Sequence, residues 1–318
     1  MAYYFVKLGP GNSLAVALLE EGRLSRPAVA GFFRDLRLPA IEQLTPDQRP
    51  RFSRQAVDLY RWSRGETPGY AVTVAGGTLY VLEPVGPMYE MEQQLFEKTV
   101  GPTPHGDDVP KLVPVHIAYR DDLTHIPGLL AQITSNRKLS SSTFKEISDD
   151  FGTELAVEHV LFKGGLQSTY PHSREDQRNL YHLLLCLPTN ELVYLIARLL
   201  EEQGLHVSAP TGGFVRNIDL FAYNDSCSER RVLSLSVPGR SRFRPGAVAI
   251  QVRGRMQDEE PEVSREVSYL VQLNGAEGDR ILGYDWIEAL LAVSPRTKAW
   301  LARLLRWVPF AGSVLRRL

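Results

Sequence analysis

Alternating apolar and polar positions predict short β-strands in the first half of the chain. The runs AVTV (residues 71–74) and TLYVLEPV (residues 78–85) are separated by Gly76-Gly77, which is the pattern of a β-hairpin. Glycine and proline punctuate the whole of this half. We therefore expect a small β-rich domain with a few helices over residues 1–150, followed by a connection over residues 151–182.

A different pattern begins after residue 182. The segment PTNELVYLIARLLEEQGLHV has apolar residues at helical spacing and predicts a core-facing helix that Asn190 caps and Gly204 ends. A short strand, LHV, a glycine turn and the strand IDLFAYN follow. The later stretch AVAIQVRGR (residues 247–255) alternates as a strand does, so that one face carries Ala249, Gln251 and Arg253.

The carboxylate of Asp219 lies inside the apolar strand IDLFAYN. A buried carboxylate must find a cation, a hydrogen-bond donor or a metal, because an unpaired buried charge is costly. Metal-dependent nucleases use this arrangement: an acidic strand and a neighbouring strand direct oxygen ligands at Mg²⁺, and a nearby cation offsets charge on the phosphate. The order of parts therefore indicates a nuclease-type site.

Composition narrows the classes of function. The chain has 318 residues, of which 43% are hydrophobic and 23% charged, which is enough for two domains. Cys186 and Cys227 form no CxxC pair, so we expect neither a disulfide framework nor a zinc ribbon. Histidines show no HxxxH or HExxH spacing, and His206 is expected to be a core residue. Without a signal-peptide pattern or a long apolar segment, we expect a cytoplasmic protein.

The net charge of −1 conceals a basic segment. Between Ser226 and Arg255, Glu229 stands alone against a run of arginines. Such a segment is either a solvated loop or a surface that contacts phosphates. The residues that we expect to bind nucleic acid are Arg230, Arg231, Arg240, Arg242, Arg244 and Arg255.

The segment ELVYLIARLLEEQGLHVSAPTGGFVRNIDLFAYN, with AIQVRGR and ILGYDWIEALL, resembles the Mrr-type restriction endonuclease domain of the PD-(D/E)xK nuclease superfamily. The resemblance implies an α/β/α domain of the restriction-endonuclease type over residues 183–293. It places the catalytic positions at Glu191, Asp219, Gln251 and Arg253 and implies that Asp219 and Gln251 hold Mg²⁺. Arg253 stands where the family has a lysine, and arginine does not release its proton at working pH.

Two strand registers are compatible with this resemblance. In the first, AVAIQVRGR is the strand beside the one that carries Asp219. In the second, RVLSLSV (residues 231–237) pairs there, and Ser234 and Ser236 take the ligand and lysine positions. The segment after AVAIQVRGR is also shorter than its counterpart in the family. The sequence leaves both registers open.

The first half carries a second resemblance. YYFVKLGPGNSLAVALLEEGRLSRPAVAGFF, QAVDLYRW and GYAVTVAGGTLYVLEPVGPMYEM resemble the EVE/PUA-like domains that often precede Mrr-type nucleases, and PVHIAYRDDLTHIPGLLAQITSNRKLSSSTFKEI resembles the segment that closes them. Such domains commonly read modified bases in an aromatic pocket, because a flipped base needs a ring to stack on. The candidates for base reading are Phe32, Phe33, Tyr60, Trp62 and Tyr89. For any one of them, the preference of aromatic residues for interiors favours the alternative of a core residue of a small barrel.

The last segment, residues 294–318, is basic and amphipathic. It contains no acidic residue, and the residues that fall close to one helical stripe are Trp300, Leu301, Leu304, Leu305 and Val308. We expect a terminal helix that packs on its own domain; the alternatives are a partner protein, nucleic acid or an anionic membrane surface. The break at Pro309 argues against a stable membrane anchor.

These patterns predict an α+β protein that binds duplex DNA, with an EVE/PUA-like reader domain and an Mrr-like domain. The expected role is bacterial restriction or antiphage defence, as a recognition or assembly subunit whose protein partner in a defence complex cuts or signals. The alternative is an active Mg²⁺-dependent DNA endonuclease that cuts foreign or modified DNA. Arg253 favours the first role, whereas Asp219 and Gln251 favour the second.

Overall fold

The expected hairpin forms near the middle of a curved sheet. In a computed structural model of the chain, β3 (Gly69–Ala75) pairs with β4 (Thr78–Pro84), with Ala75 opposite Thr78. Gly76 and Gly77 have φ values of 56° and 81°, the positive values that a two-residue type I′ turn requires at both positions. The prediction of a hairpin from its glycine pair is confirmed.

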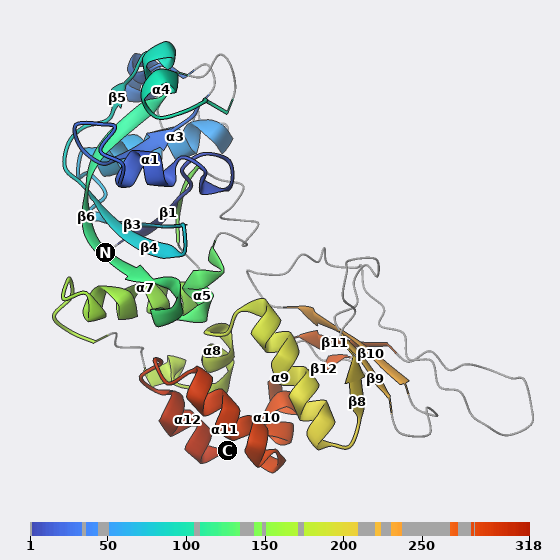
Figure 1. Cartoon of the computed structure of the whole chain (residues 1–318). Coiled ribbons are helices and arrows are strands. Elements are labelled where there is room, and N and C mark those ends of the chain that lie inside the picture. Colours follow the sequence, from blue (N-terminus) through green and yellow to red (C-terminus); the bar gives the residue numbers. More distant parts are fainter. Residues whose placement is uncertain are drawn as a thin grey trace, which may run out of the picture. The chain divides into compact units, whose positions relative to one another are not determined.

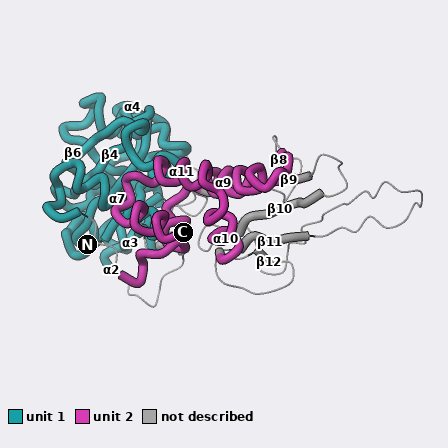
Figure 2. Tube along the Cα trace, turned by 90° about the horizontal axis from the view of Figure 1, so that it is seen from below, with its two compact units in different colours: residues 1–171 teal, residues 172–318 magenta. Residues whose placement is uncertain are grey.

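The structure describes most of the chain, with gaps. The described residues are 2–33, 36–43, 51–104, 109–133, 143–147, 151–170, 175–208, 220–223, 230–236, 268–272, 281–282 and 284–318. They fall into two compact units, residues 1–171 (unit 1) and 172–318 (unit 2), which Figure 2 colours teal and magenta.

Unit 1 is built around a seven-stranded sheet in the order β2-β6-β4-β3-β1-β7, with β5 beside β6. Apart from the hairpin, its strands are β1 (Ala2–Val6), β2 (Ala28–Gly31), β5 (Tyr89–Glu90), β6 (Lys111–Asp122) and β7 (Phe144–Glu146). The pair β1 and β3 is parallel, and the other pairs are antiparallel. The helices are η1 (Pro10–Asn12), α1 (Ala15–Leu19), α2 (Leu38–Gln43), α3 (Arg51–Ser63), α4 (Gln93–Thr99), η3 (Leu123–His125), α5 (Gly128–Ala131) and α7 (Phe151–Lys163). In Figure 1, α1 and α3 lie inside the curve of the sheet, and α5 and α7 lie on its other side.

The core of unit 1 lies between the sheet and α3. Trp62 on α3 is fully buried, and its ring centroid lies 5.4 Å from that of Phe144 on β7. The turn after β1 is tied to the same core: Asn12 accepts a 2.7 Å hydrogen bond from the Leu8 amide and donates a 2.6 Å bond to the Val74 carbonyl. The segment LGPGN (residues 8–12) is therefore a turn that is tied to the core of unit 1.

Unit 1 extends beyond the boundary that we expected at residue 150. Residues 151–163 form α7, a helix of this unit, where we expected part of a connection. Lys163 at the end of α7 bonds to Asp121 on β6, and a Cβ on the next residue, Gly164, would come within 2.8 Å of the Tyr119 ring. This close packing makes α7 part of the first core.

Unit 2 begins with helices and then forms a five-stranded sheet in the order β12-β11-β10-β9-β8. Its strands are β8 (His206–Ser208), β9 (Leu220–Tyr223), β10 (Arg230–Ser236), β11 (Ser268–Gln272) and β12 (Ile281–Leu282). Its helices are η5 (Glu175–Gln177), α8 (Leu180–Leu185), α9 (Thr189–Glu202), α10 (Tyr284–Val293), α11 (Pro295–Leu304) and α12 (Ala311–Arg317). Helix α9 contacts β8 and β9 as well as α10 and α11, so it lies between the sheet and the last helices (Figure 1).

Helix α9 follows the predicted apolar stripe. Its buried residues include Leu192, Leu195, Ile196, Leu199 and Leu200. Gly204, with φ of 82°, ends it as expected. The start differs from the prediction: the helix begins at Thr189 after Pro188, and Asn190 lies in the first turn instead of capping it. Pro188 occupies the cap position with φ of −59° and ψ of 155°, and its side chain has no hydrogen-bonding group with which to cap the helix.

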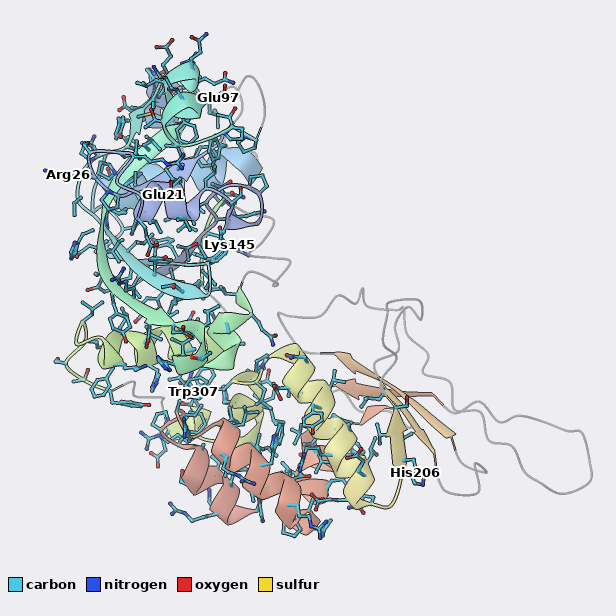
Figure 3. All side chains as sticks on the ribbon, viewed as in Figure 1. Glu21, Arg26, Glu97, Lys145, His206 and Trp307 are labelled. Carbon is cyan, nitrogen blue, oxygen red and sulfur yellow. The ribbon has the colours of Figure 1, made fainter. Side chains whose placement is uncertain are left out.

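Two further expectations concern single elements. His206, expected in the core, is exposed on the short strand β8 (Figure 3), because β8 is an edge strand of the sheet. Residues 294–318 pack on their own unit, as predicted: α11 contacts α9, and α12 contacts α8.

None of the described helices combines the length and apolarity that a bilayer crossing requires. The two units, each with a sheet and helices, confirm the α+β class.

Candidate functional site

The strand that follows Asp219 has two neighbours in the sheet of unit 2. Strand β9 begins at Leu220 and lies between β8 and β10. It runs antiparallel to β10, with Leu220 opposite Leu233 and Tyr223 opposite Arg230. Along residues 220–223, both edges of β9 are therefore taken by segments other than residues 247–255. This pairing matches the second register, in which RVLSLSV lies beside the strand of Asp219.

Most residues of the expected nuclease site lie outside the described part of the chain. These residues are Asp219, Gln251, Arg253, Arg240, Arg242, Arg244 and Arg255. Glu191 is described and lies half-buried in the first turn of α9. Arg230 and Arg231 begin β10, opposite Tyr223 and Ala222. The convergence of Asp219 with Gln251 stays a prediction.

The magnesium site also stays a prediction. Within the ranges that the structure describes, no three side chains of His, Cys, Asp or Glu come together as metal ligands would. Asp219 and Gln251 are not among those residues, so this observation does not bear on them. Of the acidic residues expected around the metal, Glu191 in the first turn of α9 lies within the described part of the chain.

Two of the five base-reading candidates are core residues. Trp62 is fully buried, and its indole N–H donates a 2.9 Å hydrogen bond to the Gly69 carbonyl. Phe33 is only 4% exposed and belongs to the same apolar cluster. A base could stack on either ring only if the core opened. We therefore remove both residues from the base-reading candidates. Their rings are already covered by other side chains of the core, as is usual for buried aromatic residues.

The other three candidates are at least partly accessible. Phe32 lies edge-on to Phe96, with ring centroids 5.7 Å apart. Tyr60 has one face beneath the Arg64 guanidinium, 5.5 Å from the ring centroid, and its hydroxyl bonds to Glu42. Tyr89 is 39% exposed on β5. A base-reading surface on unit 1 would be built from these three rings.

A cationic and aromatic surface lies between α9 and α11. Two open hollows of about 440 and 520 Å³ meet at Arg198, which lines both. We call this surface the α9–α11 cleft, and its lining residues are Arg198, Glu201, Glu202, Pro295, Arg296, Thr297, Trp300, Arg303 and Leu304. One hollow lies at the start of α11 and the other along its last two turns.

Arg198 is held in the cleft by two aromatic rings. Its guanidinium carbon lies 5.5 Å from the Tyr194 ring centroid and 5.4 Å from that of Trp300. The two rings are themselves edge to face, with centroids 5.4 Å apart. One guanidinium nitrogen donates a 3.2 Å bond to the Tyr194 hydroxyl, whereas the buried Nε finds no acceptor among the described residues. Ring contacts of this kind orient a guanidinium without neutralising its charge.

The two carboxylates of the cleft have different roles. Glu202 accepts hydrogen bonds from the Thr297 amide (2.6 Å) and hydroxyl (2.5 Å), in the first turn of α11. It therefore caps that helix and stabilises its positive end. Glu201, its neighbour, is exposed. Among the described residues that line the second hollow, Arg198, Trp300, Arg303 and Leu304, there is no carboxylate.

Comparison of the chain with protein-family models, curated proteins and solved structures finds no match. The chemistry of the described side chains is therefore the basis for a function. In the α9–α11 cleft, the guanidinium of Arg198, held beside an indole, and the exposed Arg296 and Arg303 suit a ligand that is both anionic and planar.

Sequence reasoning found only half of this cleft. Residues 294–318 stand out as basic, and they supply Arg296, Trp300 and Arg303. Tyr194 and Arg198 carry no such signal, because they lie on the polar side of an ordinary amphipathic helix. One clue was available: the spacing of four residues lets a tyrosine hydroxyl meet an arginine on one helix face.

Proposed function

We propose that the chain is a DNA-binding protein of bacterial restriction or antiphage-defence type. In this proposal, unit 1 is an EVE/PUA-like reader of modified DNA, and unit 2 is an Mrr-like pseudonuclease of restriction-endonuclease architecture. The element order of unit 2 supports the assignment: helix α9 is followed by the antiparallel strands β8, β9 and β10, and then by β11 parallel to β10. The resemblance implies this order as far as the third strand; the helix that the family has next would fall within residues 237–267, which lie outside the described part of the chain.

The pairing of β9 with β10 carries the choice of binding over cutting. In the resemblance, the strand beside that of Asp219 supplies a metal ligand and a lysine. Here that strand reads RRVLSLS, with Ser234 and Ser236 at the two positions. A neutral hydroxyl supplies neither the negative charge that Mg²⁺ attracts nor the cation that offsets phosphate charge. The arginines at the start of β10 suit contact with phosphates.

The reader role of unit 1 is supported by its curved sheet and its accessible rings. Phe32, Tyr60 and Tyr89 are the candidates that an extruded base could reach without opening the core. The protein partner that cuts or signals, and the cytoplasmic location, belong to the same proposal. Mg²⁺ enters only under the alternative, in which the chain is itself an endonuclease.

A cleavage assay tests the proposal directly. Purified chain is incubated with labelled duplex DNA, plain and base-modified, in the presence of Mg²⁺ or Mn²⁺, and binding and cutting are measured in parallel. We expect binding without appreciable cutting, both by the unmodified chain and by Asp219→Ala. Robust cutting that Asp219→Ala abolishes would replace this proposal with the active Mg²⁺-dependent endonuclease and would make Arg253 a working substitute for the lysine.

A second assay tests the arginines of β10. Arg230→Ala with Arg231→Ala should weaken duplex binding about equally for all sequences and lower the slope of log affinity against log salt by about 2, because each phosphate contact releases about one counterion. Arg316→Ala, an exposed arginine of α12, is the matched control and should leave the slope unchanged. If Arg316→Ala changes the affinity and the salt slope as much as the two β10 substitutions do, β10 is not part of the DNA-binding surface.

A further inference from the structure

We propose that the α9–α11 cleft binds single-stranded DNA, with a base stacked on Trp300 and phosphates held by Arg198, Arg296 and Arg303. The choice of DNA rests on the proposed function of the chain. The single-stranded form is inferred from the cleft itself, because a base is free to stack on a side chain only where it is unpaired.

The stripe that α11 contributes has the spacing of a polynucleotide surface. Arg296, Trp300 and Arg303 stand at positions i, i+4 and i+7, which fall on one face of a helix. At 1.5 Å per residue, the two arginines are separated by about 10 Å along the axis, with the indole between them. Cationic groups that alternate with aromatic rings are the surface on which single strands bind without sequence preference.

Arg198 completes the surface from the facing helix. Tyr194 and Trp300 hold its guanidinium in place, so little side-chain entropy is lost when a ligand arrives. Its buried Nε has no acceptor within the described part of the chain. Arg198 lines both hollows, so its terminal guanidinium nitrogens can donate to a phosphate oxygen that enters the cleft.

The charges within the cleft indicate where the phosphates lie. Glu202 is occupied as the cap of α11, and Glu201 lies on the hollow at the start of that helix. The second hollow, beside Trp300 and Arg303, has no carboxylate among its described lining residues. We therefore place the stacked base and its phosphate in the second hollow, and we assign Arg296 to a neighbouring phosphate at the edge of the first.

Most apolar side chains of these helices pack within unit 2. In α11, α12 and the turn between them, the apolar residues Leu301, Leu305, Val308, Phe310, Val314 and Leu315 are buried within unit 2. Trp300, Leu304 and Trp307 are partly exposed, and the exposed charged residues are all basic: Arg296, Arg303, Arg306, Arg316 and Arg317. Both hollows are open to solvent, which suits an extended strand better than an enclosed small molecule.

Binding of a labelled oligo-dT of about 12 nucleotides to the full chain, measured by fluorescence anisotropy over a range of salt, tests this assignment. We expect Trp300→Ala to weaken binding about 5- to 100-fold and Trp300→Phe to retain most of it, because a phenyl ring still stacks. Arg303→Ala should lower the salt slope by about 0.7, the value for one phosphate of a single strand. Arg316→Ala, equally exposed but outside the cleft, should change neither quantity.

Four other outcomes would overturn either this inference or the proposed function. If Trp300→Ala and Arg303→Ala bind as Arg316→Ala does, the cleft is not the site. If the chain binds duplex DNA but not oligo-dT, this inference is overturned while the proposed function stands. If oligo-dT binding depends on the cleft and duplex binding is absent, the inference stands and the proposed function does not. Tighter binding of oligo-U than of oligo-dT would overturn the assignment to DNA. Arg303 is exposed, so its variant keeps the test valid even if Trp300→Ala fails to fold.

Discussion

At the scale of single residues, the carboxylate of Asp121 joins two layers of unit 1. It accepts hydrogen bonds from Lys163 on α7 (2.5 Å) and from the Tyr119 hydroxyl (2.9 Å), and it lies 3.2 Å from a ring nitrogen of His125. Burial by itself would raise the pKa of Asp121, but these hydrogen bonds outweigh it and lower the pKa to about 2. A carboxylate so perturbed is often catalytic, but here its partners are those that fasten a helix to a strand.

The Asp121 network predicts a pH dependence of stability. Because the folded-state pKa lies below the ordinary value of 3.8, the carboxylate stabilises the fold above about pH 4, and that contribution is lost as the pH falls toward 2. Asp121→Asn should lower the free energy of unfolding by on the order of 1–2 kcal/mol at pH 7 and by much less near pH 2. Urea unfolding followed by circular dichroism at several pH values measures the difference.

Lys163→Met serves as the partner variant for this network, because it removes the cation and keeps the apolar stem. Its free energy of unfolding should also be lower than that of the unmodified chain at pH 7, and the difference should be smaller near pH 2. If the free energies of unfolding of Asp121→Asn and the unmodified chain differ by the same amount at pH 7 and pH 2, the ion pair does not contribute to stability as described.

At the scale of elements, the contact between α9 and α11 depends on one carboxylate. Glu202 near the end of α9 accepts both the amide and the hydroxyl hydrogen of Thr297 in α11. Ser294, at the position before α11, makes no side-chain cap. The cap of α11 is thus supplied from another helix, and the same contact fixes the spacing of the cleft between them.

Loss of this cap should destabilise unit 2. Glu202→Ala removes the acceptor of two hydrogen bonds and should lower the free energy of unfolding by about 1 kcal/mol, or Tm by about 3 °C. Glu202→Gln keeps an oxygen acceptor and should lose less. Glu201→Ala changes the exposed neighbour and should have little effect. Equal Tm values for the Glu201 and Glu202 variants, measured by thermal circular dichroism, would show that the cap is not needed.

At the scale of the whole molecule, unit 1 ends at residue 171, whereas the glycine and proline content of the sequence predicted a boundary at residue 150. Glycine and proline are dense before residue 150, but α7 beyond it belongs to unit 1. Tyr3 at the start of the chain donates a 3.3 Å hydrogen bond to Glu158 on α7, and burial raises the pKa of both groups. The first strand of unit 1 and its last helix, α7, are therefore in contact.

A truncation series tests where unit 1 ends. Residues 1–171 should fold alone with a cooperative urea transition, whereas residues 1–150, which we first expected to be sufficient, should be clearly less stable. The shorter fragment lacks Leu155, Val157, Val160 and Leu161, which are buried, and each such side chain is worth about 1.5–3 kcal/mol when fully buried. Equal transition midpoints for the two fragments would restore the boundary at residue 150.

The sequence by itself determined the elements whose signal is local. The stripe of Leu192, Leu195 and Leu199 specified α9, and the glycine pair at 76–77 specified the hairpin, because helix periodicity and turn conformation depend on residues close in the chain. From such elements the α+β class followed. The basic character of residues 294–318 was equally plain from composition.

Only the tertiary structure decided which of these elements meet. Both RVLSLSV and AVAIQVRGR alternate as strands do, and β9 pairs with the first. Trp62 and Phe33 carry the same aromatic signal as Tyr89, yet they are buried and Tyr89 is exposed. Arg198 and Trp300 lie about a hundred residues apart and meet across two helices. Strand partners, burial and cleft residues depend on long-range packing, which local propensity does not encode.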